Sequence, residues 1–239
     1  MIGRRFLQAV LRRGGIDVRR YSATRSASWR RAALLHRLAV DLVVDAGANV
    51  GDYAAELRRS GYTGRIVCFE PVASVFAVLE ARSAHDDAWE CHRLALGATD
   101  GEAVINVGGS TRTSSLLALA PGLEASDDWR SERTELVRVA TLDSLLESAF
   151  RDARRVLLKL DVQGAELDVL AGAPAAIGRV VALEVELPLR QFYVGQPTHR
   201  AIVDALDDLG FGAVSIEPGY VEPRSGAMTY ADALFARPD

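Results

Sequence analysis

The chain has 239 residues, of which 49% are hydrophobic and 25% charged, and its formal net charge is −4. This length and composition suit a globular domain with a substantial core and exclude fibrous, low-complexity and disulfide-built proteins. No apolar stretch approaches the ~20 residues that a membrane-spanning helix needs. The two cysteines, Cys68 and Cys91, form no C-x-x-C pair. We expect both to be reduced and buried, which indicates a cytoplasmic protein.

The first 40 residues are strongly basic. They hold ten arginines and one acid, Asp17, for a net charge of +9, which leaves −13 for the other 199 residues. The apolar run in this segment is too short for a secretory signal. We expect residues 1–40 to form a basic, helical N-terminal extension that packs loosely on the acidic core or touches an anionic partner. The extension is not expected to build the catalytic centre, and residues 41–239 are expected to form the functional domain.

From residue 41 the chain alternates short apolar runs with helix-like segments, which is typical of a mostly parallel α/β sheet. The predicted strands of this sheet are Leu42–Ala46, Arg65–Glu70, Trp89–Leu94, Arg155–Asp161 and Val180–Leu187. The predicted helices between and after them are Asp52–Ser60, Ser74–Ser83, Ala165–Ala171 and Thr198–Leu209.

Two segments interrupt this alternation. Residues 97–140 contain two strand-like runs around a Ser/Thr-rich loop, which predicts an inserted hairpin. The last third of the chain contains "AVSIEP" and "YADALFARPD", two strand-like runs without a helix between them. Strands joined in this way pair antiparallel, so we expect such a pair at one edge of the sheet. The sequence thus predicts a Rossmann-like α/β fold.

Acidic residues mark the carboxyl ends of four predicted strands. In open α/β sheets, ligands bind beyond these ends. The charged residues found there are Asp45, Glu70, Lys159, Asp161, Glu184 and Glu186. Their convergence predicts a ligand site at this edge of the sheet.

The first loop, "VVDAGANVGDYA", differs from the G-x-G-x-x-G spacing of dinucleotide-binding loops. Its glycines are expected to turn tightly and approach a ligand closely. Asp45 would repel a phosphate but suits a cationic amino-acid group, and Glu70 has the position of an acid that binds ribose hydroxyls. S-adenosylmethionine (SAM) combines both features. Its predicted binding residues are Asp45, Gly47, Asn49, Gly51, Glu70 and Asp161, with Leu94, Ala95 and Leu96 beside the adenine.

Six stretches within residues 41–236 resemble the FkbM family of methyltransferases. They are "VVDAGANVGDYAAELRRSGYTGRIVCFEPVASVFAVLE", "LALGATDGEAVINV", "TSSLLA", "TLDSLL", "LLKLDVQGAELDVLAGA" and "EVELPLRQFYVGQP". The resemblance implies a class I methyltransferase fold, SAM as donor, and a hydroxyl acceptor on a sugar, polyketide or similar metabolite. Gln163 departs from the pattern, because many members of the family have Glu there.

Methyl transfer from a sulfonium is an in-line displacement, so catalysis depends on placing the acceptor oxygen and removing its proton. We expect Asp161 to orient the donor or acceptor and Glu186 to accept the proton. Lys159 is the only lysine in the sequence. It is expected to pair with Glu184 or Asp161 and to hold the carboxylates in place.

Four alternatives stay open. No set of Cys, His and acidic residues has the spacing of a metal site, so no metal is expected, although Asp161 with Glu186 would allow a magnesium-dependent O-methyltransferase. The glycine spacing disfavours a dinucleotide-dependent oxidoreductase. The strand-end acids disfavour a non-catalytic adenosyl-binding protein of the same fold. The acidic core disfavours methylation of nucleic acid, so the expected acceptor is a small molecule or carbohydrate.

Overall fold

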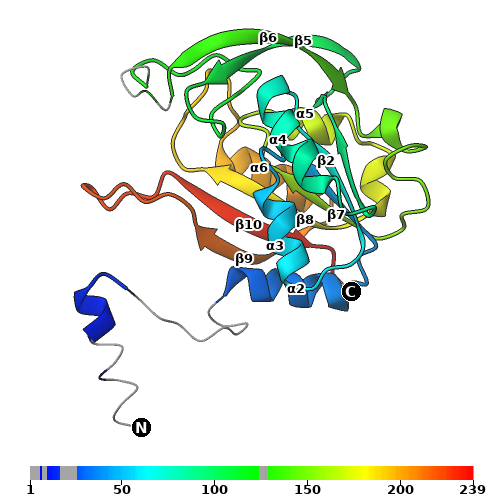
Figure 1. Cartoon of the computed structure of the whole chain (residues 1–239), viewed down its shortest axis with the longest axis horizontal. Helices are drawn as coiled ribbons and strands as arrows, with labels where there is room; N and C mark the ends of the chain where they lie inside the picture. The colour runs from blue at the N-terminus through cyan, green and yellow to red at the C-terminus, as the bar shows by residue number, and fades with distance from the viewer. Residues whose placement is uncertain (1–5, 7–9, 17–25, 124–126, 128, 239) are drawn as a thin grey trace.

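A seven-stranded sheet runs through the part of the chain described by the computed structural model, residues 6, 10–16, 26–123, 127 and 129–238 (Figure 1). The strand order is β3-β2-β1-β7-β8-β10-β9, and β10 is antiparallel to both of its neighbours. The strand bounds are β1 Leu42–Ala46, β2 Arg65–Phe69, β3 Trp89–His92, β7 Val156–Leu160, β8 Val180–Pro188, β9 Gly212–Pro218 and β10 Tyr230–Ala236. The order reverses between β1 and β7, which is where open α/β sheets bind ligands.

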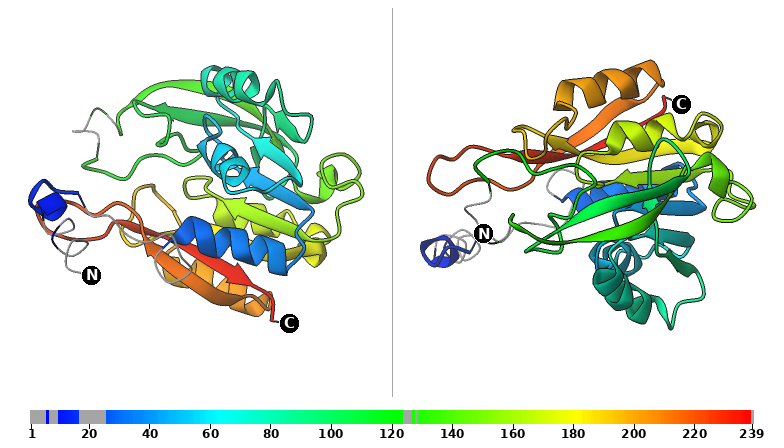
Figure 2. Two further views of the ribbon diagram at one scale, coloured as in Figure 1. Left: turned by 60° about the horizontal axis from the view of Figure 1, so that its bottom comes forward. Right: turned by 90° about the horizontal axis from the view of Figure 1, so that it is seen from above.

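Helices cover both faces of this sheet (Figure 2). One face carries α2 (Ala27–Arg37), α3 (Asp52–Arg59) and α4 (Ala73–Ser83), and the other carries α5 (Glu166–Ala171) and α6 (His199–Asp208). The 3-10 turns η1 (Asp143–Leu145) and η2 (Ala176–Arg179) lie with α5 and α6. We refer to these faces as the α2–α4 face and the α5–α6 face.

Strand alternation decides which side chains each face receives, because successive residues of a strand point to opposite sides. In β7, Leu158 and Leu160 join the apolar cluster of the α5–α6 face, whereas Leu157 joins the cluster of the α2–α4 face. Lys159 therefore points to the α2–α4 side. The same parity places the strand residues Asp45, Glu184, Glu186 and Asp232 on that side, together with Glu70, which directly follows β2.

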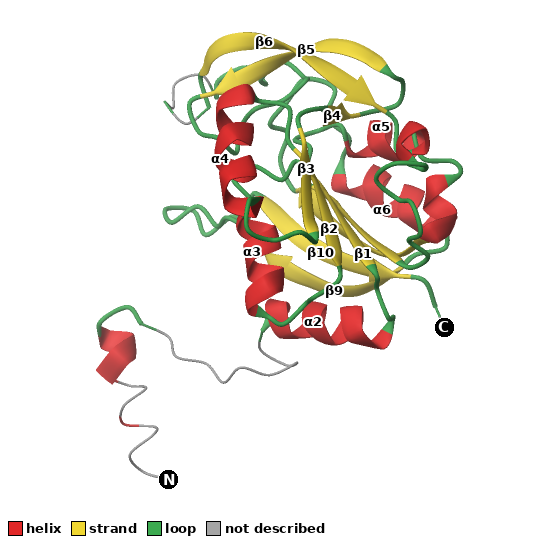
Figure 3. Cartoon of the chain, turned by 45° about the vertical axis from the view of Figure 1, so that its right-hand side comes forward, coloured by secondary structure: helices red, strands yellow, loops and turns green. Residues whose placement is uncertain are grey.

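A second, three-stranded sheet is inserted after β3 (Figure 3). It consists of β4 (Ala95–Leu96), β5 (Gly101–Gly108) and β6 (Ser131–Ala140), and β5 and β6 pair antiparallel. An apolar cluster that includes Val75 of α4, Ile105 and Val137 joins this small sheet to the main body. The prediction of an inserted hairpin is confirmed, and so are the mostly parallel sheet and the antiparallel C-terminal pair.

Helix α2 corrects the prediction for the N-terminal extension. Its sequence "AALLHR" provides an apolar stripe, and Leu34, Leu35 and Leu38 are each at most 5% exposed in the core of the α2–α4 face. Ser26 caps the helix, since its Oγ accepts a hydrogen bond from the backbone N–H of Trp29. The expected loose packing is therefore wrong for residues 26–40. Residues 1–5, 7–9 and 17–25 of the predicted extension lie outside the described residues.

The described residues contain no helix that is both long and apolar enough to cross a membrane. Both cysteines are free thiols, and Cys68 is buried, but Cys91 is only half-buried. Cys91 is less enclosed than predicted because it lies on β3, the edge strand of the main sheet.

Candidate active site

A cavity of about 940 Å³ opens at the carboxyl ends of the central strands. This volume lies in the range of small-molecule sites. Most of the residues predicted to form the site line the cavity, namely Gly47, Asn49, Glu70, Leu94, Ala95, Leu96, Lys159, Asp161, Glu184 and Glu186. The structure thus brings together residues from β1, β2, β4, β7 and β8. Asp45 and Gly51 lie behind the cavity wall.

The loop after β1 takes its shape from left-handed backbone conformations. The φ angles of Gly47, Asn49 and Gly51 are +76°, +50° and +83°. A Cβ atom on Gly47 would lie 1.9 Å from the carbonyl oxygen of Asp161, and one on Gly51 would lie 2.8 Å from Leu79 and Trp89. We expected these glycines to let the backbone approach a ligand. Gly47 lines the cavity, and both glycines also let the loop pack against its protein neighbours.

Glu70 connects this loop to the end of β2. Its carboxylate accepts one hydrogen bond from the backbone N–H of Asn49 (3.0 Å) and one from that of Val72 (2.9 Å). Burial raises the pKa of Glu70 to about 7, against the opposing effect of these two bonds. Each oxygen has two acceptor positions, so one position on each remains for a ligand hydroxyl. The buried acid therefore fits a bound ribose.

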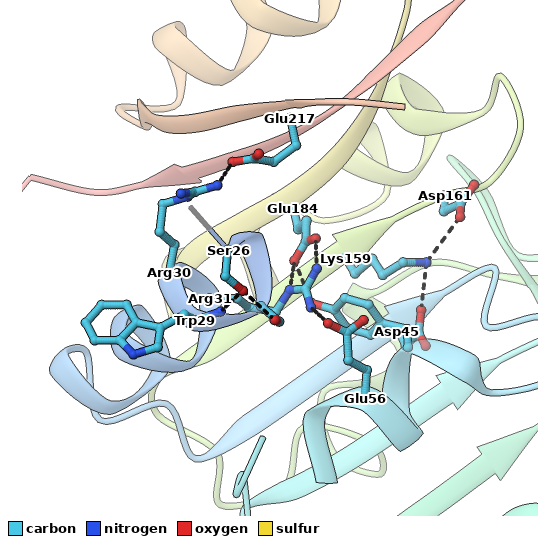
Figure 4. Close-up of polar contacts among 12 residues, drawn as sticks. Ser26, Trp29, Arg30, Arg31, Asp45, Glu56, Lys159, Asp161, Glu184 and Glu217 are labelled. Carbon is cyan, nitrogen blue, oxygen red and sulfur yellow. Dashed lines mark hydrogen bonds and ion pairs between the residues drawn. The ribbon is translucent and has the colours of Figure 1, made fainter. Parts of the chain in front are cut away.

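Lys159 lies between two carboxylates (Figure 4). Its Nζ is 3.1 Å from Oδ1 of Asp45 and 3.3 Å from Oδ2 of Asp161. Burial alone would lower the pKa of Lys159, but Asp45 and Asp161 outweigh it and raise the pKa, so the ammonium stays charged. Asp45 is fully buried, which raises its pKa against the effect of Lys159. The predicted pairing of Lys159 with Asp161 is confirmed, and Asp45 acts on the cavity through this lysine.

Glu184, the other partner considered for Lys159, forms its ion pair with Arg31 instead. Arg31 of α2 binds both of its oxygens, with Nε at 2.7 Å and Nη2 at 2.6 Å. The hydroxyl of Tyr53 donates a third hydrogen bond to Glu184 at 2.7 Å. Arg31 also lines the cavity, so α2, which lies within the predicted N-terminal extension, reaches the candidate site.

Glu186 and Asp232 lie opposite each other on β8 and β10, and both line the cavity. Neither carboxylate has a hydrogen bond or ion pair with any residue that the structure describes. Burial raises the pKa of Glu186 well above its ordinary value, and Asp161 and Asp232 add to the rise. Glu186 is therefore a carboxylate that takes up a proton readily.

Gln163 links the central strand to the wall of the cavity. Its amide Nε2 donates to Oδ1 of Asp161 at 2.9 Å, and its Oε1 accepts from the hydroxyl of Tyr193 at 3.0 Å. An ionised Glu at this position has no proton to donate to Asp161. The departure from the family pattern thus gives Asp161 a donor that an ionised Glu would lack.

Several cavity residues were not predicted. Trp129 and Phe192 stack with ring centroids 4.7 Å apart and form an aromatic part of the wall. The other unpredicted lining residues that bear on the chemistry are Arg31, Tyr53, Tyr230 and Asp232. Asp232 could have been predicted from the alternation of "YADALFA" in the last strand, because that pattern places Asp232 on the face opposite to Ala233 and Phe235. The described residues contain no group of three or more His, Cys, Asp or Glu side chains that would hold a metal ion.

A family model described as the methyltransferase FkbM domain matches residues 45–212 of the chain. Among curated proteins, "Methyltransferase 1" of Beauveria bassiana (strain ARSEF 2860) is 27% identical over 142 residues. That match covers 54% of this chain and 57% of the fungal protein, so the chain matches little more than half of its length.

Two solved structures are similar to the chain at low identity. Magnesium protoporphyrin IX methyltransferase from Synechocystis PCC 6803, with bound SAM, is 14% identical with a TM-score of 0.48. The match covers 88% of this chain and 78% of that one. An rRNA methylase from Streptococcus thermophilus is 11% identical with a TM-score of 0.45, over 90% of this chain and 98% of that one.

Proposed function

The chain belongs to the FkbM methyltransferase family and uses SAM as its methyl donor, and from this premise we propose that it methylates a hydroxyl group of a small molecule or carbohydrate. One observation carries the proposal. A single cavity wall combines a buried acid with free acceptor positions, Glu70, and a second acid, Glu186, that has no hydrogen-bond or ion-pair partner among the described residues. The first suits the ribose of the donor, and the second suits the proton of the acceptor.

The residues of the cavity fit the donor. Glu70 would hold the two ribose hydroxyls, and the buried apolar side chains of Leu94, Ala95 and Leu96 would contact the adenine. Asp161 lies on the wall where the cationic end of the donor is expected, which favours a positive charge. Asp45, Gly47, Asn49 and Gly51 shape the loop around this part of the cavity. SAM supplies the methyl group on a sulfonium sulfur.

The chemistry of the protein consists of orienting the acceptor and taking up its proton. Glu186 accepts the proton of the hydroxyl group, since burial and the neighbouring carboxylates of Asp161 and Asp232 raise its pKa and make it a stronger base. Asp161 orients donor or acceptor and is itself held by Lys159 and Gln163. An alkyl hydroxyl loses its proton late in the displacement, so a carboxylate suffices as the base without a metal.

Two further features of the proposal concern the setting of the enzyme. The free thiols Cys68 and Cys91 favour the cytoplasm, where thiols stay reduced. A contact between residues 1–40 and an anionic partner stays a proposal based on the charge of +9 in that segment.

The proposed function is tested by incubating the protein with SAM labelled in its methyl group and a panel of sugars, hydroxylated polyketides and phenols. Each alcohol is paired with the amine that replaces its hydroxyl. We expect label in an ether product, with or without a chelator. Labelling of only the amines would contradict a hydroxyl acceptor. Activity that a chelator abolishes and magnesium restores would instead support the metal-dependent alternative.

A further inference from the structure

Helix α2 brings a cation to the cavity from outside the part of the chain that the family model matches. That match begins at residue 45, whereas the guanidinium belongs to Arg31. The side chains of Arg31 and Glu184 are each only 12% exposed, and they meet in a bidentate ion pair (Figure 4). Such pairs combine strong electrostatic attraction with a fixed geometry. Arg31 of α2 thus holds the carboxylate of Glu184 on β8 in one orientation.

The arrangement of the strands makes this pair important for Lys159. Lys159 lies directly beside Asp45 on β1 and directly beside Glu184 on β8. The side chain of Lys159 can therefore reach three carboxylates. They are those of its neighbours Asp45 and Glu184 and that of Asp161, two residues further along the chain. A buried carboxylate without a partner is costly, so Glu184 without Arg31 would attract Lys159. With Arg31 present, Lys159 instead bridges Asp45 and Asp161.

Tyr53 completes the separation of the two cations. The guanidinium of Arg31 lies 4.6 Å from the centroid of its ring, and Nζ of Lys159 lies 5.1 Å from the same centroid. The Tyr53 hydroxyl donates to Glu184, so this carboxylate receives three hydrogen bonds that do not come from Lys159. Glu184 is thereby satisfied without the lysine.

We propose that Arg31 is a positioning residue for methyl transfer, because it neutralises Glu184 and so keeps Lys159 between Asp45 and Asp161 at the cavity wall. The inference rests on the proposed function, since Asp161 and the loop after Asp45 are the parts that contact the donor. It also makes α2 a part of the functional domain.

The chain offers a matched control on the same helix. Arg30 forms an ion pair with Glu217 of β9, at the edge of the sheet, and it does not line the cavity (Figure 4). Arg30→Met and Arg31→Met each remove one arginine of α2; the first removes the ion pair with Glu217, and the second removes the ion pairs with Glu184 and with Glu56 of α3. Only Arg31→Met is expected to weaken binding of the donor.

The experiment is calorimetric titration of the folded full-length variants with S-adenosylhomocysteine. We expect Arg31→Met to weaken binding about tenfold or more, because the ion pairs at Asp45 and Asp161 are lost, and Arg30→Met to stay within about twofold of wild type. The double variant Arg31→Met/Glu184→Gln removes the competing carboxylate and is expected to recover to within about threefold of wild type. A role limited to anchoring α2 predicts no such recovery.

The outcomes separate the two proposals. Wild-type protein that does not bind S-adenosylhomocysteine contradicts the proposed function and this inference with it. Wild-type binding with equal affinities for Arg31→Met and Arg30→Met contradicts the inference alone, and so does a double variant as weak as Arg31→Met. Should Arg31→Met not fold, Arg31→Lys replaces it. Lysine lacks the planar fork that binds both oxygens of Glu184, so a loss of about threefold is expected, and unchanged affinity contradicts the inference.

Discussion

Both faces of the main sheet bury an apolar cluster, but the α2–α4 face also buries a network of charged side chains near the carboxyl ends of the strands. On the α5–α6 face, Leu158, Leu160 and Leu183 pack into an entirely apolar cluster. On the α2–α4 face, the neighbouring residues Lys159 and Glu184 belong to a charged network below the cavity. Alternation along a strand separates a stabilising face from a functional one, with a single residue between them.

The difference has an energetic consequence. Burial of apolar side chains stabilises the α5–α6 face without any need for a specific partner. A buried charge costs several kcal/mol unless its partners are well placed, so the α2–α4 face depends on each ion pair. Asp45 at 0% exposure with Lys159 is the clearest case. Replacing one charged residue of the α2–α4 face should therefore lower the free energy of unfolding far more than replacing one apolar residue of the α5–α6 face.

The largest expected effect is on turnover. Glu186→Gln keeps the shape of the side chain but removes the proton acceptor, so kcat should fall by about 10²–10⁴. Binding of S-adenosylhomocysteine should be preserved, because Glu186 is assigned to the acceptor. The control is Asp204→Asn, which removes an exposed acid of α6 on the other side of the sheet. Near-normal turnover of Glu186→Gln would remove the general base from this account.

The next effect compares the two faces directly through neighbouring residues of β7. Lys159→Met leaves Asp45 buried without its partner and should lower the free energy of unfolding by about 3–5 kcal/mol. Leu158→Met is a volume-conserving change on the α5–α6 face and should cost less than about 1.5 kcal/mol. Urea denaturation measures both. Equal losses in the two variants would show that the faces do not differ as proposed.

A smaller effect concerns the donor alone. Glu70→Ala removes the carboxylate that holds the ribose hydroxyls, and hydrogen bonds to a charged group contribute about 1.5–3 kcal/mol each. The affinity for S-adenosylhomocysteine should fall about tenfold or more by calorimetry. Unchanged affinity in a folded variant would remove Glu70 from the donor site.

The last expected effect is a pH dependence of stability. The folded-state pKa of Glu70 is about 7, above the ~4.3 of an unfolded glutamate, so the native state binds the proton more tightly. Its contribution should therefore make stability fall as the pH rises from about 4 to about 7 and stay level above. Thermal unfolding across this range should show a shallower fall for Glu70→Gln. Glu166, with a pKa also about 7, contributes with the same sign and remains in the variant.

The sequence was sufficient to predict one half of the site. Asp45, Glu70 and Asp161 could be placed because each lies at the end of an apolar strand, and parallel strands bring their carboxyl ends to one edge. The strand period also predicted that Lys159 and Asp161 share a face. The tight turn at the glycines of the loop was expected from sequence, but their protein neighbours Asp161, Leu79 and Trp89 were not.

The other half depends on contacts between elements that are far apart in the chain. Arg31 reaches Glu184 across 153 positions, and this pairing depends on where α2 packs. Asp232 faces Glu186 because of the register of β8 and β10, which local sequence does not specify. Gln163 was noted because many members of the family have Glu there. Its hydrogen bond with Tyr193, however, could not be predicted, because Tyr193 lies in a loop that is distant in the sequence. These residues were inaccessible because propensity and periodicity carry only local information.

The most direct test of the central claim is a crystal structure of the complex with S-adenosylhomocysteine. The account predicts the ligand in the cavity at the carboxyl ends of the central strands, with its ribose hydroxyls bonded to Glu70 and its adenine against Leu94–Leu96. Its sulfur should lie towards Asp161 and Glu186, with Lys159 still between Asp45 and Asp161. A ligand bound outside this cavity, or a ribose that makes no contact with Glu70, would contradict it.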